Sequence, residues 1–350
     1  MKQLFIKAAT GEACFREVDE PPLDHPQAVK VDTVVSAVSA GTERRIITAI
    51  RSGEAKFDED RPLGYASAGI VREMGAEAEG VAPGDLVAVY GSVAVLGGHL
   101  SVTVPRKHHF AKVPEGVTPA EAAFAAPACF PLNGLRLCRP QMGETFLVFG
   151  MGLLGLIGVQ LARAMGLVVV AVEPSEFRRA KAREVGADFV FAPDDDGLER
   201  AVGLYTEGAG ADAALVCTAT ESGGPITQAM ALLREKGRIA LVGGGETVAR
   251  RRGPFHHKEL EILAVKAAGP GRYDERYEND CIDYPIAYVR WTMHRNLKEV
   301  VRLMAAGVLR MEPLITDRLS IEGAPAGFDR LVAGDEKLIG MVIEYDGSEE

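Results

Sequence analysis

The 350-residue sequence has a formal net charge of −10, with 47% hydrophobic and 25% charged residues. This balance is typical of a globular protein of about two domains, and its acidity disfavours nucleic acids and anionic membranes as partners. No apolar run reaches the roughly 18 residues of a membrane span, and the alternating N-terminus does not resemble a signal peptide, so we expect a cytoplasmic protein.

The five cysteines are an odd number and form no CxxC pair. A structural zinc lobe would need four clustered thiolates to complete a tetrahedron. We therefore expect buried free thiols in a reducing compartment.

The first 115 or so residues contain short apolar runs of strand length, such as AVKVDTVVSAVSA, SAGIVREMG and DLVAVYGSV. Glycine and proline separate these runs, which predicts a compact antiparallel barrel. Thr118, followed by Pro119 and Glu121, then indicates the start of a helix, with threonine as the N-cap.

From residue 144 onward, continuous apolar runs alternate with helical segments, which predicts a parallel sheet covered on both faces. Within this region, GMGLLG supplies a G-x-G-x-x-G motif at Gly150, Gly152 and Gly155. The motif follows the strand-like run 146–149 and precedes the helical run 153–165, as a dinucleotide-binding loop requires.

Each part of this loop has a physical role. Gly150 permits the tight turn, Gly152 lets the backbone approach the pyrophosphate, and Gly155 lets helix and strand pack closely. The phosphates would meet N–H groups where the helix opens, at Leu153 and Leu154.

Glu173 follows 18 residues after Gly155, where a carboxylate can accept both ribose hydroxyls and repel a 2′-phosphate. NAD is therefore favoured over NADP as the cofactor, although Arg178 and Arg179 offer charge that a phosphate could use. Thr218 and Gly243, in the strand-containing stretches ADAALVCTA and GRIALVGGG, are further cofactor-binding candidates.

Residues 269–296 fit neither pattern and contain four of the eight tyrosines and the single tryptophan. Long irregular segments in compact domains are commonly functional, and the aromatic content argues against disorder. Arg272, Tyr284, Arg290 and Trp291 would suit a hydroxylated or anionic substrate through forked donors and a stacking face. The alternative is a structural insertion that packs on a neighbouring subunit.

These motifs together resemble the medium-chain dehydrogenase/reductase family over nearly the whole chain, from SAGTE (39–43) and PLGYASAGIV to PLITDRLSIEGAPAGFDRL. The resemblance implies an α/β fold with a GroES-like β-barrel catalytic domain (1–128 and 296–350) and a Rossmann doubly wound parallel sheet domain (129–295). It also implies an active site in the cleft and a homodimer or homotetramer. Closer resemblances are to the dehydrogenase part of bacterial bi-domain oxidoreductases and, mainly over the first 80 residues, to bacteriochlorophyllide dehydrogenases.

The resemblance also raises a question about metal. Where the family's zinc enzymes have Cys-Gly-x-Asp and Gly-His-Glu, this chain has Ala40, Glu43 and Tyr65 in place of the Cys, the Asp and the His. Cys129 alone falls near a third ligand, whereas a catalytic zinc needs three protein ligands plus water. We therefore expect no zinc, and name Tyr65, Glu43 and His99 as the candidate catalytic residues.

The sequence thus predicts a zinc-independent, NAD-dependent oxidoreductase that interconverts a secondary alcohol and a ketone on a small molecule, with a polyol, sugar or cyclitol as substrate. Three alternatives stay open: an NAD(P)H-dependent enone or quinone reductase, a bacteriochlorophyllide-type dehydrogenase, and a dinucleotide-binding protein without turnover. NADPH preference and an apolar pocket would favour the reductase.

Overall fold

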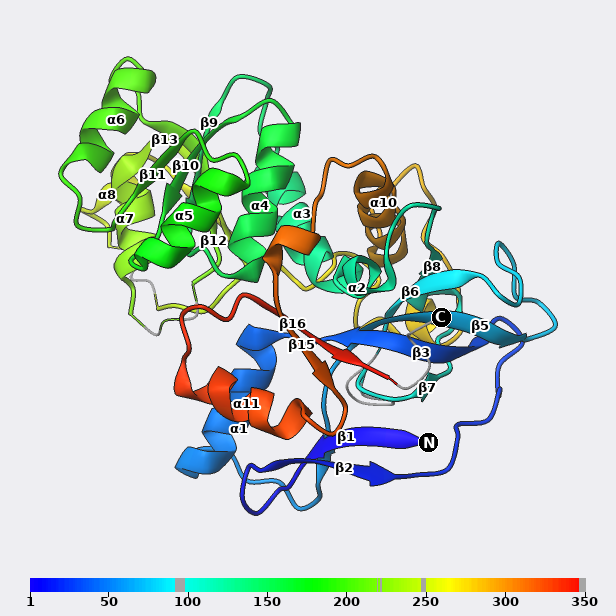
Figure 1. Cartoon of the computed structure of the whole chain (residues 1–350). Coiled ribbons are helices and arrows are strands. Elements are labelled where there is room, and N and C mark those ends of the chain that lie inside the picture. The colour runs from blue at the N-terminus through cyan, green and yellow to red at the C-terminus, as the bar shows by residue number, and fades with distance from the viewer. Residues whose placement is uncertain (92–97, 219, 221, 247–249, 346–350) are drawn as a thin grey trace. The chain divides into compact units, whose positions relative to one another are not determined.

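The computed structural model describes residues 1–91, 98–218, 220, 222–246 and 250–345 (Figure 1). The chain forms two compact units, one of residues 1–127 with 270–350 and the other of residues 128–269. Residues 270–295, which the family resemblance placed in the nucleotide-binding domain, belong to the first unit. The reason is that Arg272 and Tyr277 pack there, on Tyr90 and His108 respectively.

The first unit is built mainly from sheets. Its larger sheet has the strand order β15-β16-β3-β5-β6-β8, with β7 also paired to β3. The bounds are β3 Val29–Ala37, β5 Ala66–Met74, β6 Leu86–Tyr90, β7 Val102–Thr103, β8 Phe110–Lys112, β15 Ile315–Ser320 and β16 Gly340–Glu344. A smaller sheet has the order β2-β1-β4, formed by β1 Lys2–Ile6, β2 Ala13–Glu17 and β4 Arg61–Pro62.

Both chain ends contribute to this unit, because β16 pairs antiparallel with β3. Strand β3 alternates buried and partly exposed residues over its first half, as a strand with one covered face should. The helices are α1 Ala40–Ser52, α2 Pro119–Ala122, α9 Glu275–Glu278, α10 Met293–Ala305 and α11 Ala324–Ala333, with the short helices η1 Lys107–His109 and η2 Glu312–Leu314.

Two helix-level features of this unit follow from the sequence. The predicted N-cap at Thr118 is confirmed, since its side chain accepts the Glu121 N–H in a capping box and Pro119 opens α2. Helices α1 and α11 pack over one apolar cluster, in which Ile47 and Phe328 meet Ile343. That cluster fixes α1 against the end of the sheet and so positions its first turn.

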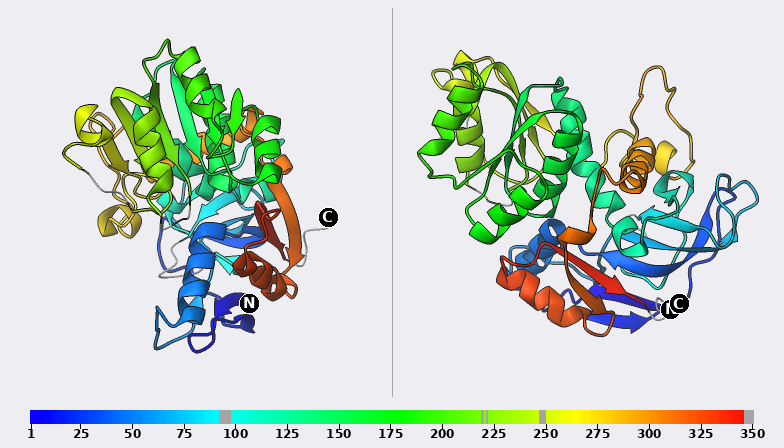
Figure 2. Two further views of the ribbon diagram at one scale, coloured as in Figure 1. Left: turned by 90° about the vertical axis from the view of Figure 1, so that its left-hand side faces the viewer. Right: turned by 45° about the horizontal axis from the view of Figure 1, so that its top comes forward.

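The second unit is a single parallel sheet of six strands in the order β11-β10-β9-β12-β13-β14. Its strands are β9 Thr145–Phe149, β10 Val168–Val172, β11 Phe189–Phe191, β12 Ala211–Val216, β13 Leu233–Leu241 and β14 Glu261–Ala264. Its helices are α4 Leu153–Ala164, α5 Glu176–Glu184, α6 Gly197–Tyr205, α7 Gly224–Leu232 and α8 Pro254–His257, and α3 Ala125–Cys138 leads into it. Helices flank the sheet, as Figure 2 shows.

The strand order in this unit reverses between β9 and β12, so the crevice at their carboxyl ends is where a doubly wound sheet binds its ligand. The strands β9 and β10 are apolar apart from Thr145 at the start of β9, as expected for a sheet covered on both faces. The predicted fold class, a sheet-rich catalytic domain with a Rossmann-type domain, is confirmed. Within the described part of the chain, no helix combines the length and apolar character needed to cross a bilayer.

Candidate active site

Glu43 is held by the first turn of α1. Ser39 precedes the helix, and its backbone N–H donates to Glu43 Oε1 over 2.8 Å. A carboxylate in the first turn is favoured by the helix dipole, yet here the side chain is buried, with only 2% of its surface exposed. A buried carboxylate requires hydrogen-bonding partners.

His99 supplies the second partner of that carboxylate. Its Nε2 lies 3.0 Å from Glu43 Oε2, and its Nδ1 lies 2.7 Å from Ser36 Oγ. The backbone of His99 is fixed as well, since its N–H donates to Leu63 O. Both ring nitrogens are therefore engaged, and the ring is fully buried.

The glycine in PLGY is required by this histidine. Gly64 has φ +83°, and a Cβ there would lie 2.7 Å from the His99 ring. A side chain at this position would meet both backbone strain and a steric clash. Gly64 thus allows the residue after it, Tyr65, to lie close to the Glu43–His99 pair.

Tyr65 joins the same network through a serine. Its hydroxyl donates to Ser39 Oγ over 2.8 Å, and its ring packs at a tilt on Tyr90, with centroids 5.6 Å apart. Burial raises the pKa of Tyr65 well above its ordinary value, and the charge of Glu43 adds to that effect. The phenol therefore stays protonated and acts as a hydrogen-bond donor.

The structure thus brings together all three residues that the sequence named as catalytic. It adds Ser39 and Ser36, which the sequence patterns did not single out, and Tyr345, whose hydroxyl lies 3.2 Å from Ser36 Oγ. Ser39 could have been noticed as the residue just before a helix. Nothing in the local sequence marks Tyr345, because 309 positions separate it from Ser36.

The donor atoms in this region do not fit a three-ligand zinc site. Glu43 and His99 are bonded to one another, and Tyr65 donates to Ser39. Across the described ranges, no group of three or more His, Cys, Asp or Glu side chains is placed to hold a metal ion. A catalytic zinc requires three protein ligands, and the side chains around Tyr65 do not supply them.

The glycine-rich loop lies between β9 and α4. Gly150 has φ +87°, a conformation that favours glycine. A Cβ on Gly155 would lie only 1.8 Å from Gly150 O, whereas a Cβ on Gly152 would meet no protein atom within 4 Å. The fold itself therefore requires Gly150 and Gly155. Gly152 faces open space at the start of the helix that includes Leu153 and Leu154.

Thr218 and Gly243 lie beside this loop, at the ends of β12 and β13. A Cβ on Gly150 would lie 2.9 Å from Thr218 Cγ2, and one on Gly243 would lie 2.0 Å from Thr218 O. The Thr218 hydroxyl is buried and has no hydrogen-bond partner among the described residues. The predicted cofactor residues thus converge at the sheet's switch point, and Thr218 offers a polar group that a ligand could satisfy.

Glu173 is fixed by two backbone donors. Its Oε2 accepts the Met151 N–H over 2.6 Å, and its Oε1 accepts the Ser175 N–H over 3.0 Å. Each carboxylate oxygen retains a second lone pair for a hydroxyl. Of the two arginines nearby, Arg179 bonds to the backbone oxygen of Glu173 and pairs with Glu176, while Arg178 is half-buried in the first turn of α5.

The residues named for substrate binding lie in the segment 270–295 and contact other parts of it. The Tyr284 hydroxyl donates to Asp274 Oδ2, and the exposed Arg290 lies over the Trp291 ring at 4.0 Å. Arg272 is the arginine that approaches the Tyr65 region. Its guanidinium lies 5.0 Å from the centre of the Tyr90 ring and pairs with Glu278.

Known proteins resemble the chain along most of its length. Residues 154–279 match the family described as zinc-binding dehydrogenase. L-threonine 3-dehydrogenase of Pyrococcus abyssi is 27% identical, over 90% of this chain and 88% of its own. D-guloside 3-dehydrogenase of Escherichia coli is 25% identical, over 77% and 73%. Among solved structures, alcohol dehydrogenase TADH from Thermus sp. ATN1 superposes with a TM-score of 0.79 at 18% identity, covering 99% of this chain and 100% of its own.

Proposed function

We propose, from the premise that the chain is an oxidoreductase with a domain of the zinc-binding dehydrogenase family, that it interconverts a secondary alcohol and a ketone without zinc. The observation that carries this proposal is the network in which Tyr65, Ser39, Glu43 and His99 lie together. A metal-free hydride transfer needs a side chain to give or take the hydroxyl proton. Tyr65 is the residue of this network suited to that role.

In the proposed mechanism, Tyr65 binds the reacting oxygen of the substrate. Because its phenol remains protonated, it donates a hydrogen bond to a carbonyl oxygen and its proton to a developing alkoxide. Ser39, whose hydroxyl accepts the phenol's hydrogen bond, would return that proton. Glu43 and His99 lie at the buried end of the network and hold it in place. They also supply the negative charge that stabilises a proton within the network.

The second unit supplies the cofactor site of the proposed mechanism. The open side of Gly152 and the buried Thr218 hydroxyl, which has no partner among the described residues, both fit a bound dinucleotide. The nicotinamide would accept or donate the hydride, while the chain orients it through the loop 150–155. NAD is preferred in this proposal because Glu173 is fixed beside the loop, where its charge disfavours a 2′-phosphate.

The substrate is proposed to be a polyol, sugar or cyclitol, by analogy with relatives such as the D-guloside 3-dehydrogenase. The Tyr284, Arg290 and Trp291 side chains remain candidates for its recognition, and Arg272 is added because it packs on Tyr90. The homodimer or homotetramer and the cytoplasmic location remain predictions. Light scattering of the purified protein measures the first of them.

The test is a panel of polyols, sugars, cyclitols and their ketones, followed at the absorbance band of the reduced nicotinamide. Turnover of a polyhydroxylated alcohol with NAD, unchanged after dialysis against a chelator, is the expected result. Elemental analysis of the same preparation should find no stoichiometric zinc. Activity confined to enones or quinones with NADPH, or activity that chelation removes and zinc restores, would overturn the proposal.

A further inference from the structure

A buried hydrogen-bond chain leaves the Glu43–His99 pair through the second ring nitrogen of His99. His99 Nδ1 lies 2.7 Å from Ser36 Oγ, and Ser36 Oγ lies 3.2 Å from the Tyr345 hydroxyl. His99 and Ser36 have no exposed surface, and Tyr345 has only 3%. The pair is therefore shielded from solvent at His99, but it is connected by side-chain hydroxyls to Tyr345.

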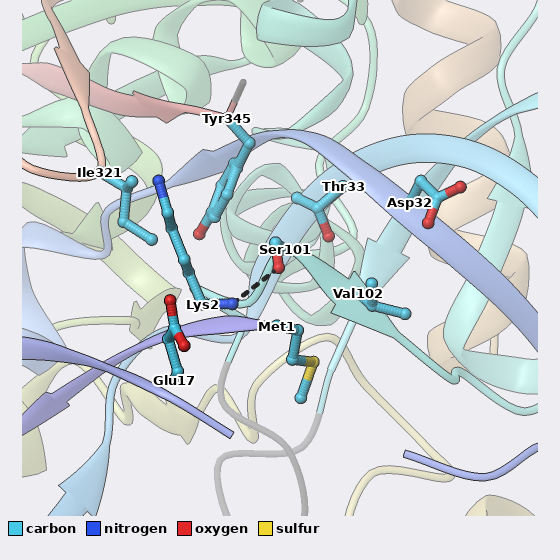
Figure 3. Close-up of a pocket in the computed structure, with 9 residues that line it drawn as sticks. All are labelled: Met1, Lys2, Glu17, Asp32, Thr33, Ser101, Val102, Ile321 and Tyr345. Carbon is cyan, nitrogen blue, oxygen red and sulfur yellow. Dashed lines mark hydrogen bonds between the residues drawn. The ribbon is translucent and has the colours of Figure 1, made fainter. Parts of the chain in front are cut away.

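Tyr345 lines a pocket of about 470 Å³ that is partly open to solvent. Figure 3 shows its ring reaching from the end of β16 toward Ser101 and Lys2. The other lining residues are the polar Glu17, Asp32 and Thr33 and the apolar Met1, Val102 and Ile321. A polar pocket of this volume has room for several water molecules.

Every member of the chain can both accept and donate a proton. Serine and tyrosine hydroxyls do so by rotation, and imidazole does so through its two nitrogens. Burial raises the pKa of Tyr345 above its ordinary value, and the charge of Glu43 contributes, so the phenol is present in its protonated form. If neutral His99 donates its Nε2–H to Glu43, its Nδ1 accepts the hydroxyl hydrogen of Ser36. The Ser36 oxygen then accepts the hydroxyl hydrogen of Tyr345.

We propose that Ser36 and Tyr345 form the proton route between the Glu43–His99 pair and water in this pocket. The inference rests on the proposed function and adds to it that the pair exchanges a proton with the Tyr65–Ser39 hydroxyls in each turnover. When Glu43 takes up a proton, it receives the Nε2 proton of His99, and His99 accepts the proton of Ser36 at Nδ1. Tyr345 then replaces the proton of Ser36, and a pocket water replaces that of Tyr345. Each O–H or N–H bond that breaks is replaced, and no electrons are transferred.

The first test does not depend on turnover. In protein labelled with 15N-histidine, the ring N–H of His99 is identified by its loss in His99→Gln, and its exchange with water is measured. We expect exchange to slow at least about tenfold in Tyr345→Phe and Ser36→Ala, because each removes one hydroxyl that the route requires. Thr33→Val is the matched control. It removes a buried hydroxyl that lines the same pocket and has no partner among the described residues.

The second test uses the alcohol that the panel identifies. Tyr345→Phe should lower kcat by up to about 100-fold, raise the solvent deuterium isotope effect on kcat, and leave KM unchanged, since it slows proton transfer alone. Small buffers such as imidazole should restore part of the rate by entering the pocket. Thr33→Val should behave as the unsubstituted protein.

The two tests separate the two hypotheses. If folded Tyr345→Phe and Ser36→Ala retain the original His99 exchange rate, kcat and isotope effect while Tyr65→Phe is inactive, the route is wrong and the proposed function stands. If exchange slows in both variants but no alcohol is oxidised, the route exists and the proposed function is wrong. Equal slowing in Thr33→Val would mean that the pocket was merely disturbed, and would overturn the route.

Discussion

His99 Nε2 lies 3.0 Å from Glu43 Oε2, and both side chains are almost fully buried. The two residues lie 56 positions apart, one in the first turn of α1 and the other in the stretch that precedes β7. Removing the ring that donates to a buried carboxylate is costlier than neutralising the carboxylate, because the charge then stays buried without that donor. This asymmetry gives the first prediction.

His99→Phe should lower the free energy of unfolding by about 3 kcal/mol, because Glu43 loses its ring donor inside the core. Glu43→Gln should lower it by only about 1 kcal/mol, because the amide oxygen can still accept the Ser39 N–H. Urea unfolding of both variants measures the difference. Equal losses in the two variants would contradict an ionised Glu43.

Tyr65→Phe should lower kcat by about 10²- to 10⁴-fold, because the substrate oxygen loses its proton donor. The ring still packs on Tyr90, so the variant should keep its fold and its dinucleotide affinity. Steady-state kinetics on the best panel substrate, with circular dichroism for folding, check this. Tyr288→Phe is the control, because Tyr288 is 87% exposed. A Tyr65→Phe variant with full kcat would assign the chemistry to other residues.

Three glycine-to-alanine changes separate fold from binding. Gly155→Ala should prevent normal folding, since its Cβ would lie 1.8 Å from Gly150 O. Gly152→Ala should fold but bind NAD at least about tenfold more weakly, because the methyl group faces the place of the pyrophosphate. Gly203→Ala in α6, also without a neighbour within 4 Å, is the matched control and should leave the affinity unchanged. Calorimetric titration measures all three.

Glu173→Gln should weaken NAD binding and reduce the preference for NAD over NADP. The amide lacks the charge that repels a 2′-phosphate and is a poorer acceptor for ribose hydroxyls. Fluorescence titration with both nucleotides measures the ratio of their dissociation constants. Glu184→Gln, at the far end of α5, removes an equal charge and should not change that ratio. Tighter binding of NADP by the unsubstituted protein would contradict the assignment.

His294 should make the protein less stable in acid. Burial, with Lys298 and His108 nearby, lowers the pKa of His294 from 6.5 to about 3. Between these values the unfolded chain binds a proton that the folded chain excludes, so this contribution to stability is lost as the pH falls. His294→Gln should show a shallower loss of unfolding free energy below about pH 6.5. His25→Gln, at a half-buried histidine in the loop before β3, is the control. If the unfolding free energy of His294→Gln falls with decreasing pH as steeply as that of the unsubstituted protein, the assignment is contradicted.

Much of the nucleotide-binding half could be predicted from sequence because its determinants are local. Gly150, Gly152 and Gly155 lie within one short stretch of chain, and the apolar runs around them specify a parallel sheet. The fold class followed from the same patterns. The domain boundary near residue 270 could not be predicted, because it depends on where Arg272 and Tyr277 pack, and packing partners distant in the chain leave no periodic signal.

By itself, the sequence determined which residue types stand where the zinc enzymes it resembles have metal-binding motifs, and it identified Tyr65, Glu43 and His99 as candidates. Only the tertiary structure decided how they connect. Ser39 joins Tyr65 to the helix that carries Glu43, and Ser36 joins His99 to Tyr345. A hydrogen bond depends on positions within about 3 Å, and residues from β3, α1 and the end of β16 reach such positions only after the sheet and its apolar cluster have assembled.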